Sequence, residues 1–153
     1  MIDSRSRADV VEALGAALTR MPLTQSAAAR FEELVTSGLD RLPRPGQGDT
    51  LLRWRALATV AGYDISLVKL YEGHTDALAI LAELEGVVDR NAHDTSGVWA
   101  AEPPGVRVMI EPLDEGAVRL RGRKPWCSGA AHVSHGLLTA WHAPTGRARN
   151  SCE

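Results

Sequence analysis

The segment from residue 124 to residue 136 reads KPWCSGAAHVSHG and gathers the side chains of this chain best suited to chemistry. A thiol with imidazoles suits a zinc ion, and a thiol beside an imidazole suits nucleophilic catalysis. A tryptophan followed by a hydroxyl suits a flat cofactor. A bend between strands can carry the same residues and needs no chemistry at all.

The metal interpretation depends on Cys127, His132, His135 and His142, which form the pattern C-x4-H-x2-H-x6-H. Thiolate and imidazole are zinc ligands, but this spacing matches no common zinc arrangement. On a strand, His132 and His135 point to opposite faces because their separation is odd. The pattern therefore favours a structural role for these residues, and we expect no metal.

The nucleophile interpretation needs Cys127 as a thiolate with a partnered histidine. His132 is near in sequence, but no acidic residue is placed to orient its ring. Asp114 and Glu115 form a carboxylate pair in a predicted turn, where solvated charges are the simpler interpretation. No GxGxxG or Walker-type loop follows a predicted strand, so a phosphate-binding loop is not supported.

Helical periodicity runs through the first part of the chain and predicts the elements that must position this segment. It predicts helices over about residues 6–20, 24–39, 49–62 and 65–86, the third capped by Asp49 and the fourth by Ser66. The third helix is expected to bury Leu51, Trp54, Ala58 and Ala61 and to direct Arg53 and Arg55 outward. Gly73 inside the fourth helix indicates either a close packing contact or a tolerated weak point.

Alternation with a period of two replaces the helical pattern after residue 86. Val106, Val108 and Ile110, and then Val118 and Leu120, alternate with polar residues as in half-buried antiparallel strands. We therefore predict an α+β fold, with a helical domain over residues 1–92 and an incomplete antiparallel β domain over residues 93–153. So few strands leave sheet edges and an apolar face open.

Composition limits the class of protein. The chain has 153 residues, of which 44% are hydrophobic and 24% charged, and its formal net charge is −2. This balance predicts a soluble protein that binds neither nucleic acid nor a membrane. The N-terminus lacks a signal-peptide pattern, and Cys127 and Cys152 show no CxxC spacing, so we expect a cytoplasmic protein with Cys127 reduced.

Three stretches, taken in order, resemble the acyl-CoA dehydrogenase family of flavoenzymes. They are SLVKLYEGHTDAL, VWAAEPPG and RLRGRKPWCSGAAHVSHGLLTAW, and the resemblance runs from about Ile65 to Trp141. In that family a helical domain leads into an antiparallel β domain, and a four-helix bundle follows. The resemblance implies FAD as the cofactor and dehydrogenation of an acyl-CoA thioester in fatty acid metabolism. It also implies an electron-accepting flavoprotein as partner, and a homo-oligomer.

The resemblance also implies roles for particular residues. The family's Val-Thr-Glu-Pro segment, which runs along the flavin edge, is similar to residues 100–103, and its Gly-x-Lys-x-Trp-Ile-Thr segment is similar to residues 122–128. Trp126, Cys127 and Ser128 would then form a wall for the flavin, with Ala100 and Ala101 offering backbone groups. An indole can cover a flat ring system, and a hydroxyl can hydrogen-bond the flavin where hydride arrives.

The sequence departs from the family pattern in ways that bear on activity. Ala101 stands where the family has threonine, and residues 104–106 read Pro-Gly-Val where the family continues Gly-x-Gly-Ser-Asp. The catalytic carboxylate of the family lies in the C-terminal bundle, so we assign no catalytic residue, and Glu72 and Glu102 are poor candidates for the base. The expectation is a shortened flavoprotein. The alternative is a non-catalytic remnant or a protein-interaction domain without a cofactor.

Overall fold

The computed structural model describes residues 4–84, 91 and 93–142, and it has the predicted α+β fold. The chain forms two compact units, which we describe separately. The helical unit comprises residues 1–98 and 128–137, and the strand unit comprises residues 99–127 and 138–153. The predicted domain division at residues 92 and 93 stays a prediction. Residues 93–98 and 128–137 nevertheless group with the helices.

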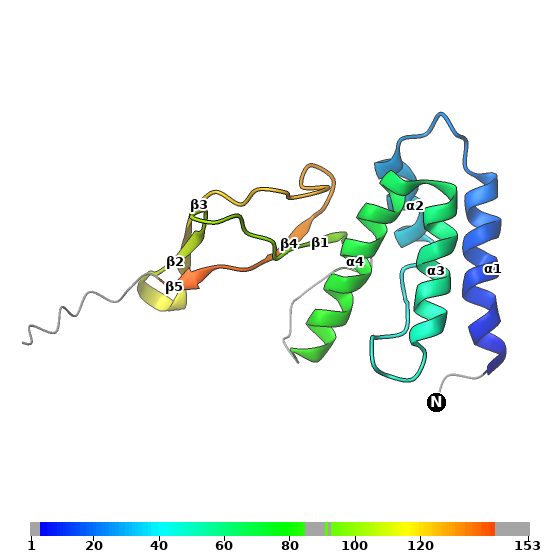
Figure 1. The fold of residues 1–153 in the computed structure, drawn as a ribbon, viewed down its shortest axis with the longest axis horizontal. Helices are drawn as coiled ribbons and strands as arrows, with labels where there is room; N and C mark the ends of the chain where they lie inside the picture. Colours follow the sequence, from blue (N-terminus) through cyan, green and yellow to red (C-terminus); the bar gives the residue numbers. More distant parts are fainter. Residues whose placement is uncertain (1–3, 85–90, 92, 143–153) are drawn as a thin grey trace, which may run out of the picture. The chain divides into compact units, whose positions relative to one another are not determined.

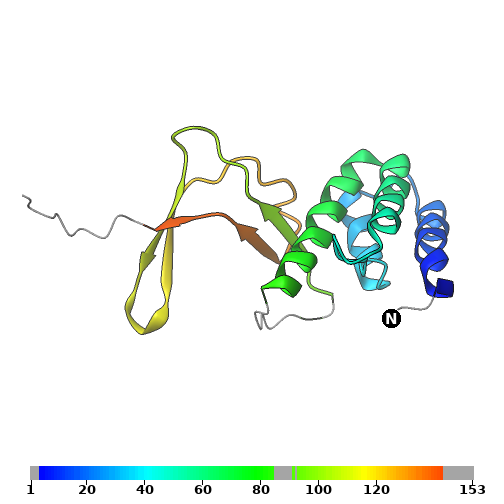
Figure 2. The same cartoon turned by 60° about the horizontal axis from the view of Figure 1, so that its bottom comes forward.

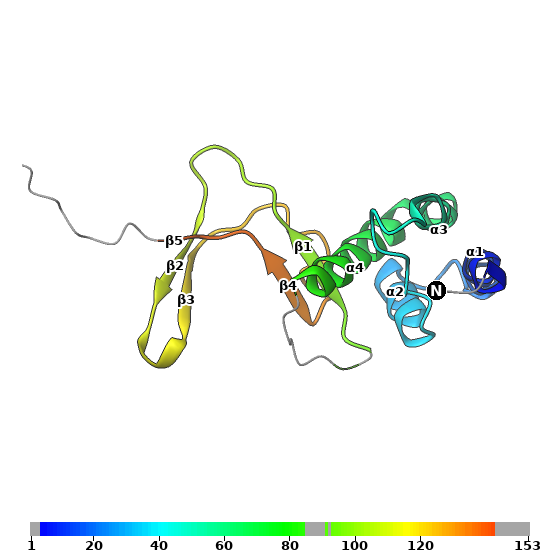
Figure 3. The same ribbon diagram turned by 90° about the horizontal axis from the view of Figure 1, so that it is seen from below.

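The helical unit contains α1 (Ser4–Arg20), α2 (Ala27–Thr36), α3 (Thr50–Tyr63) and α4 (Ile65–Glu83). Helix α3 packs on both α1 and α4, and α2 packs on α4, as Figure 1 shows. Strands β1 (Ser96–Trp99) and β4 (His135–Leu138) pair with each other and are seen side by side in Figure 3. The buried core comes from all four helices: Leu14, Ala17, Leu18, Met21, Phe31, Leu34, Val35, Ala56, Val60, Leu67 and Tyr71.

The buried face of α3 is not the predicted one. Leu51 and Trp54 are 67% and 63% exposed, whereas Arg53 is only 4% exposed. The Arg53 guanidinium donates to Asp76 Oδ1 at 2.5 Å, to Thr75 Oγ1 at 3.1 Å and to the Pro43 carbonyl at 3.2 Å. A buried guanidinium is tolerated when its donors are satisfied in this way, so the ion pair decides which face turns inward.

The N-cap of α4 lies two residues earlier than the sequence indicated. Asp64 is the N-cap, and its Oδ1 accepts from the Ser66 and Leu67 amides at 2.6 and 3.0 Å. The predicted cap Ser66 therefore lies inside the helix. Asp49 occupies the N-cap position of α3 as predicted, but its side chain makes no capping hydrogen bond. The predicted end of α4 at Gly86 lies outside the described residues.

A single buried histidine joins α4 to the chain on either side of it. His74 and Asp40 are 0% and 1% exposed, and His74 Nε2 lies 3.0 Å from Asp40 Oδ2. The amide of Ser96, at the start of β1, donates to His74 Nδ1 at 3.0 Å. Because an amide can only donate, Nδ1 is the unprotonated nitrogen, and the proton sits on Nε2 and faces the carboxylate.

Gly73, next to this histidine, lies where β1 packs on α4, so a neighbouring segment does contact the helix at this glycine. A Cβ at Gly73 would lie 3.8 Å from the Val98 amide nitrogen and 4.0 Å from Gly97 Cα, so the backbone of β1 crosses α4 at this point. These are ordinary van der Waals distances. Gly73 thus lies beneath a strand, but the space would also admit a residue with a Cβ.

The strand unit contains β2 (Val108–Pro112), a 3-10 turn at Asp114–Gly116, β3 (Val118–Gly122) and β5 (Trp141–His142). Figure 2 shows β2 and β3 as a hairpin, and their register sets Ile110 opposite Leu120 in the predicted antiparallel sense. The short pairing of β2 with β5 is parallel, which departs from the all-antiparallel prediction. Val108 is the only buried residue in the described part of this unit, so its sheet encloses no core of its own.

Replacing His74 tests whether it is needed for the helical unit. His74→Ala removes the buried hydrogen-bond donor of the Asp40 carboxylate and the acceptor of the Ser96 amide. We expect the free energy of unfolding to fall by about 3–5 kcal/mol. Denaturant titration followed by circular dichroism measures it. The matched control is His93→Ala at an exposed position. A loss for His74→Ala no larger than for His93→Ala would contradict the role.

Candidate functional site

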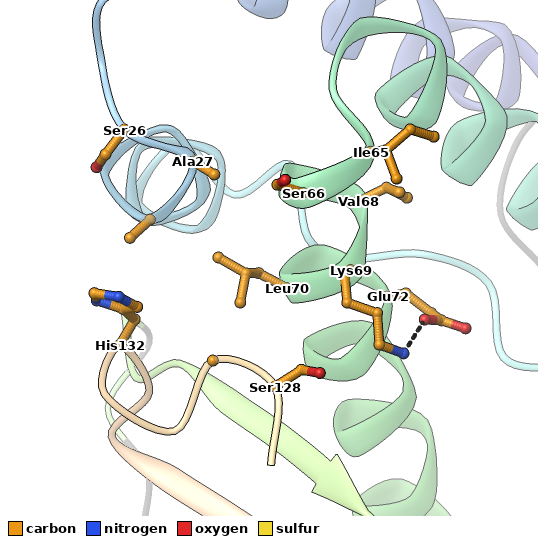
Figure 4. Close-up of a pocket in the computed structure, with 12 residues that line it drawn as sticks. Ser26, Ala27, Ile65, Ser66, Val68, Lys69, Leu70, Glu72, Ser128 and His132 are labelled. Atoms are coloured by element: carbon orange, nitrogen blue, oxygen red, sulfur yellow. Dashed lines mark hydrogen bonds and ion pairs between the residues drawn. The ribbon is translucent and has the colours of Figure 1, made fainter. Parts of the chain in front are cut away.

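A pocket of about 660 Å³ opens in the helical unit where the starts of α2 and α4 meet the turn before β4 (Figure 4). Its walls come from three segments of the chain. They are Ser26, Ala27 and Ala28; Ile65, Ser66, Val68, Lys69, Leu70 and Glu72; and Ser128, Gly129 and His132. A volume of this size is in the range of small-molecule sites.

An ion pair fixes the two helix starts relative to each other. Ser26 caps α2 by accepting from the Ala29 amide at 3.2 Å. Arg30, one turn further, donates to Asp64 Oδ2 at 2.7 Å, and Asp64 caps α4. Arg30 also lies 5.4 Å from the centre of the Tyr63 ring. The Asp64 carboxylate therefore joins the starts of both helices. The hydrogen bond from the Leu67 amide is the largest cause that lowers the pKa of Asp64, and the Ser66 amide and Arg30 lower it further.

The third wall, the turn at residues 128–134, is held against α4 by a glycine. Gly129 has φ +77°, and a Cβ there would lie 2.5 Å from Leu70 Cδ2, so a side chain would have to displace Leu70. The buried Thr95 holds the far end of the turn, because its carbonyl accepts from the Ser134 and His135 amides at 3.1 and 3.0 Å. Thr95 precedes Ser96, so the His74 hydrogen bond also anchors this wall.

The pocket is mainly apolar, with polar groups at particular points. Leu70 points into the space between α2 and the turn, and His132 lies across from it on the turn (Figure 4). Lys69 Nζ and Glu72 Oε2 form an ion pair at 3.0 Å on the α4 wall. The geometry suits an apolar or aromatic group that carries a polar edge.

A second cluster lies wholly within the strand unit and is centred on Lys124. The Lys124 side chain is 7% exposed, and its ammonium group donates to Glu102 Oε1 at 2.8 Å and to Thr139 Oγ1 at 2.6 Å. Thr139 Oγ1 in turn lies 3.1 Å from the Ala100 carbonyl oxygen. Trp141 Nε1 donates to Glu102 Oε2 at 2.8 Å. These bonds hold residues 100–103 beside residues 122–127.

The same contacts fix the charge of Glu102. Hydrogen bonds from Lys124 and then from Trp141 lower the pKa of this carboxyl group below its usual range. The Arg107 guanidinium also lies 4.3 Å from the Trp141 ring centre, which adds a cation–π contact. A carboxylate stabilised in its ionised form is a weak base, so Glu102 serves as an acceptor in this cluster.

The backbone at Trp126 is unusual. This residue has φ +59°, and it is the one residue other than glycine with positive φ in the described chain. Its side chain is 66% exposed, so the indole faces are open. Cys127 follows with its Sγ 3.2 Å from the Lys124 carbonyl oxygen, which closes a tight turn. A left-handed backbone conformation costs a bulky residue roughly 1–2 kcal/mol. The turn therefore holds the backbone of Trp126 in a conformation that tryptophan does not favour, with the indole exposed.

The predicted cofactor residues divide between the two units. Ser128 lines the pocket of the helical unit, whereas Trp126, Cys127, Ala100 and Ala101 belong to the strand unit and do not line it. Sequence reasoning missed the residues that organise both places, namely Arg30 and Asp64 at the pocket and Lys124 and Thr139 in the cluster. Lys124 was within the matched segment, but no local signal showed that Thr139 accepts from it.

The candidate metal ligands are not brought together. Across residues 4–84, 91 and 93–142, no group of three or more His, Cys, Asp or Glu side chains is arranged to hold a metal ion. His132 lines the pocket, and His135 Nδ1 lies 3.9 Å from Asp94 Oδ2. In the same part of the chain, no helix is both long and apolar enough to cross a membrane.

No protein-family model matches the chain, and no curated protein or solved structure matches it either. The resemblance to the acyl-CoA dehydrogenases therefore has only the residues themselves as support.

Acidification tests the brace between α2 and α4. Since the folded-state pKa of Asp64 is lowered, its ionised form stabilises the fold at pH values above its unfolded pKa, and this contribution is lost as pH falls through the folded value. Asp64→Asn keeps a capping side chain without the charge. We expect it to cost about 1 kcal/mol at pH 7 and progressively less towards about pH 3.

Chemical denaturation across this pH range measures the difference between Asp64→Asn and the unmodified chain. The matched control is Asp49→Asn, at an N-cap whose side chain makes no capping hydrogen bond. A difference that is constant with pH for Asp64→Asn would contradict the electrostatic brace.

The indole proton of Trp141 reports on Glu102. While Glu102 is ionised, its Oε2 accepts the Nε1–H of Trp141, and protonation weakens this bond. The NMR resonance of that proton should shift with a midpoint below pH 4.5, the ordinary value for this carboxyl group, and Glu102→Gln should abolish the shift. Trp54, exposed on α3, supplies the internal reference. A midpoint at or above the ordinary value would show that Lys124 does not stabilise the carboxylate.

Proposed function

We propose that this chain is an acyl-CoA dehydrogenase-like flavoprotein whose strand unit offers a wall for the flavin of FAD. The observation that carries the proposal is the Lys124 cluster. Its contacts at 2.8 Å to Glu102 and 2.6 Å to Thr139, with Thr139 Oγ1 3.1 Å from the Ala100 carbonyl oxygen, join the two segments assigned to the flavin by resemblance. Glu102 and Lys124 are 22 positions apart in the sequence, and nothing in either segment alone requires them to meet.

The residues present suit a flat ring system. Trp126 holds its indole open to solvent on a strained turn, and an exposed indole can stack on an aromatic ring with a gain of roughly 0.5–1.5 kcal/mol beyond burial. Ala101 has a small side chain that leaves the backbone accessible. The thiol of Cys127 contacts the Lys124 carbonyl oxygen within the turn, so this residue would shape the wall. Ser128 supplies a hydroxyl group directly after it.

FAD, when bound, accepts a hydride, and the role of the protein is to position the ring and exclude water. Trp126 would cover one face of the ring and keep water from it. A hydrogen bond from Ser128, which belongs to the helical unit, is proposed from the resemblance alone. The substrate class, an acyl-CoA thioester, is proposed from the resemblance, as are the electron-accepting flavoprotein and the homo-oligomer.

Both acidic residues considered at the start are engaged in ion pairs. Glu72 pairs with Lys69, and Glu102 is held ionised by Lys124 and Trp141. General-base catalysis contributes about 10² to 10⁴ in rate, so binding of FAD and turnover of substrate are separate questions. The proposal concerns the first, and no catalytic base is assigned.

Flavin binding provides the test. Purified protein is titrated into FAD, and quenching of flavin fluorescence together with the visible spectrum after desalting reports the complex. We expect binding by the unmodified chain and about tenfold weaker binding by Trp126→Ala, since one stacking contact is lost. The matched control is Trp54→Ala, which removes an indole of similar exposure from α3.

Lys124→Met provides a second variant for the same titration. It removes the charge that joins residues 100–103 to residues 122–127, so it should weaken FAD binding while leaving the indole in the sequence. Absence of flavin binding by the unmodified chain, or equal binding by Trp126→Ala and Trp54→Ala, would rule the proposal out.

A second candidate function is partner binding without a cofactor. Both units expose large apolar residues, and such residues can mark interaction surfaces. Those of the strand unit favour this function because its sheet encloses no core of its own. The residues are Leu113, Val118, Leu120, Trp126 and Trp141, each at least 43% exposed. A colourless protein that still captures a partner through these residues would favour this function over the flavoprotein.

A further inference from the structure

Strand β3 presents an unpaired edge in the described structure. The strand order is β3-β2-β5, so β3 lies at the outside of its sheet and bonds only to β2. Each residue from Val118 to Gly122 is exposed. The strand contains no proline and no bulge in its register with β2. Proline and bulges are two of the devices that block an edge, and without them the backbone of β3 is open to a further strand, whose charge its two arginines would select.

The two faces of this edge differ in chemistry. Val118 and Leu120 share one face and are 57% and 51% exposed. Their partners across the ladder on β2 are Pro112 and Ile110, so this face is aliphatic over both strands. Arg119 and Arg121 lie on the other face because successive side chains alternate.

The positive charge on the second face is only partly compensated. Glu111 Oε1 lies 3.2 Å from Arg121 Nε, and that arginine is 67% exposed. No ion pair is recorded for Arg119 among the described residues, although the register sets it opposite Glu111. The edge therefore carries more positive than negative charge on this face.

A second copy of the chain fits this edge poorly. Any pairing of β3 with itself that keeps the aliphatic side chains on one face sets arginine opposite arginine. In the antiparallel register centred on Leu120, for example, Arg119 faces the second copy's Arg121. Like charges directly opposite each other destabilise a strand pair. In the registers that do not keep the aliphatic side chains on one face, valine or leucine of one copy lies opposite an arginine of the other.

We propose that the edge of β3 binds an extended acidic polypeptide segment in which aliphatic residues alternate with glutamate or aspartate. Such a segment completes the β3 ladder with its backbone. Its aliphatic side chains extend the face of Val118 and Leu120, and its carboxylates lie opposite Arg119 and Arg121. The peptide would thus bind by adding a strand to the sheet, and the pairing of its carboxylates with the arginines would fix its register. The inference does not depend on flavin binding, since no flavin residue takes part.

Fluorescence polarisation with a labelled synthetic peptide that alternates valine with glutamate tests the proposal on the full chain. We expect binding that weakens as salt rises, because the arginine contacts are exposed to solvent. A peptide with lysine in place of each glutamate should bind about tenfold more weakly or not at all. Amide NMR shifts on binding should map to residues 118–122.

Variants assign the effect to this edge. Arg119→Glu should weaken the acidic peptide about tenfold and improve the lysine peptide, which is a reversal that unfolding cannot produce. Arg55→Glu, at an exposed position on α3, is the matched control and should change neither. Leu120→Asp should abolish binding of the acidic peptide, since it places a charge on the aliphatic face.

Three outcomes would overturn the proposal. The first is no binding of the acidic peptide, and the second is equal binding of the acidic and lysine peptides. The third is self-association of the unmodified chain that Leu120→Asp abolishes, since the edge would then serve a second copy. Each of these results leaves the FAD titration untouched, so the two proposals fail separately.

Discussion

The buried imidazole of His74 is the constraint on which the arrangement of the helical unit depends. It accepts from the Ser96 amide with one nitrogen and faces the Asp40 carboxylate with the other, and both contacts are 3.0 Å long. Asp40 follows α2 and Ser96 begins β1, so one ring on α4 ties segments that are 34 positions before it and 22 positions after it. Thr95, the neighbour of Ser96, then secures the turn that carries Ser128. A residue in the middle of a helix thus determines where one wall of the pocket lies.

Charged groups, more than apolar ones, set the positions of the remaining parts. Arg30 and Asp64 brace the starts of α2 and α4, Arg53 turns one face of α3 inward, and Lys124 joins two segments of the strand unit. Each pair is at least partly removed from water, where a satisfied charge specifies geometry more sharply than an aliphatic contact does. The strand unit shows this balance most clearly, because it encloses almost no core and is organised by the Lys124 cluster.

The helices and strands could be predicted because their periodicity is local. Phe31, Leu34 and Val35 gave the buried stripe of α2 correctly. The alternation at Val118 and Leu120 gave β3, but the predicted half-burial was wrong, because the unit has no core and both side chains are exposed. The face of α3 could not be predicted, because Trp54 looks like a core residue until Asp76 and Thr75 are known to satisfy Arg53. The parallel pairing of β5 and the contact of Lys124 with Thr139 link distant segments, and no local pattern encodes them. The role of His74 was missed for the same reason.

The protonation of His74 in the folded protein is the most direct test of its role, and long-range proton–nitrogen NMR of the imidazole ring measures it. The geometry predicts the tautomer with the proton on Nε2 and a nitrogen shift at Nδ1 typical of an unprotonated acceptor. A proton on Nδ1, in either the other tautomer or the imidazolium form, would contradict it, because the Ser96 amide would then have no acceptor.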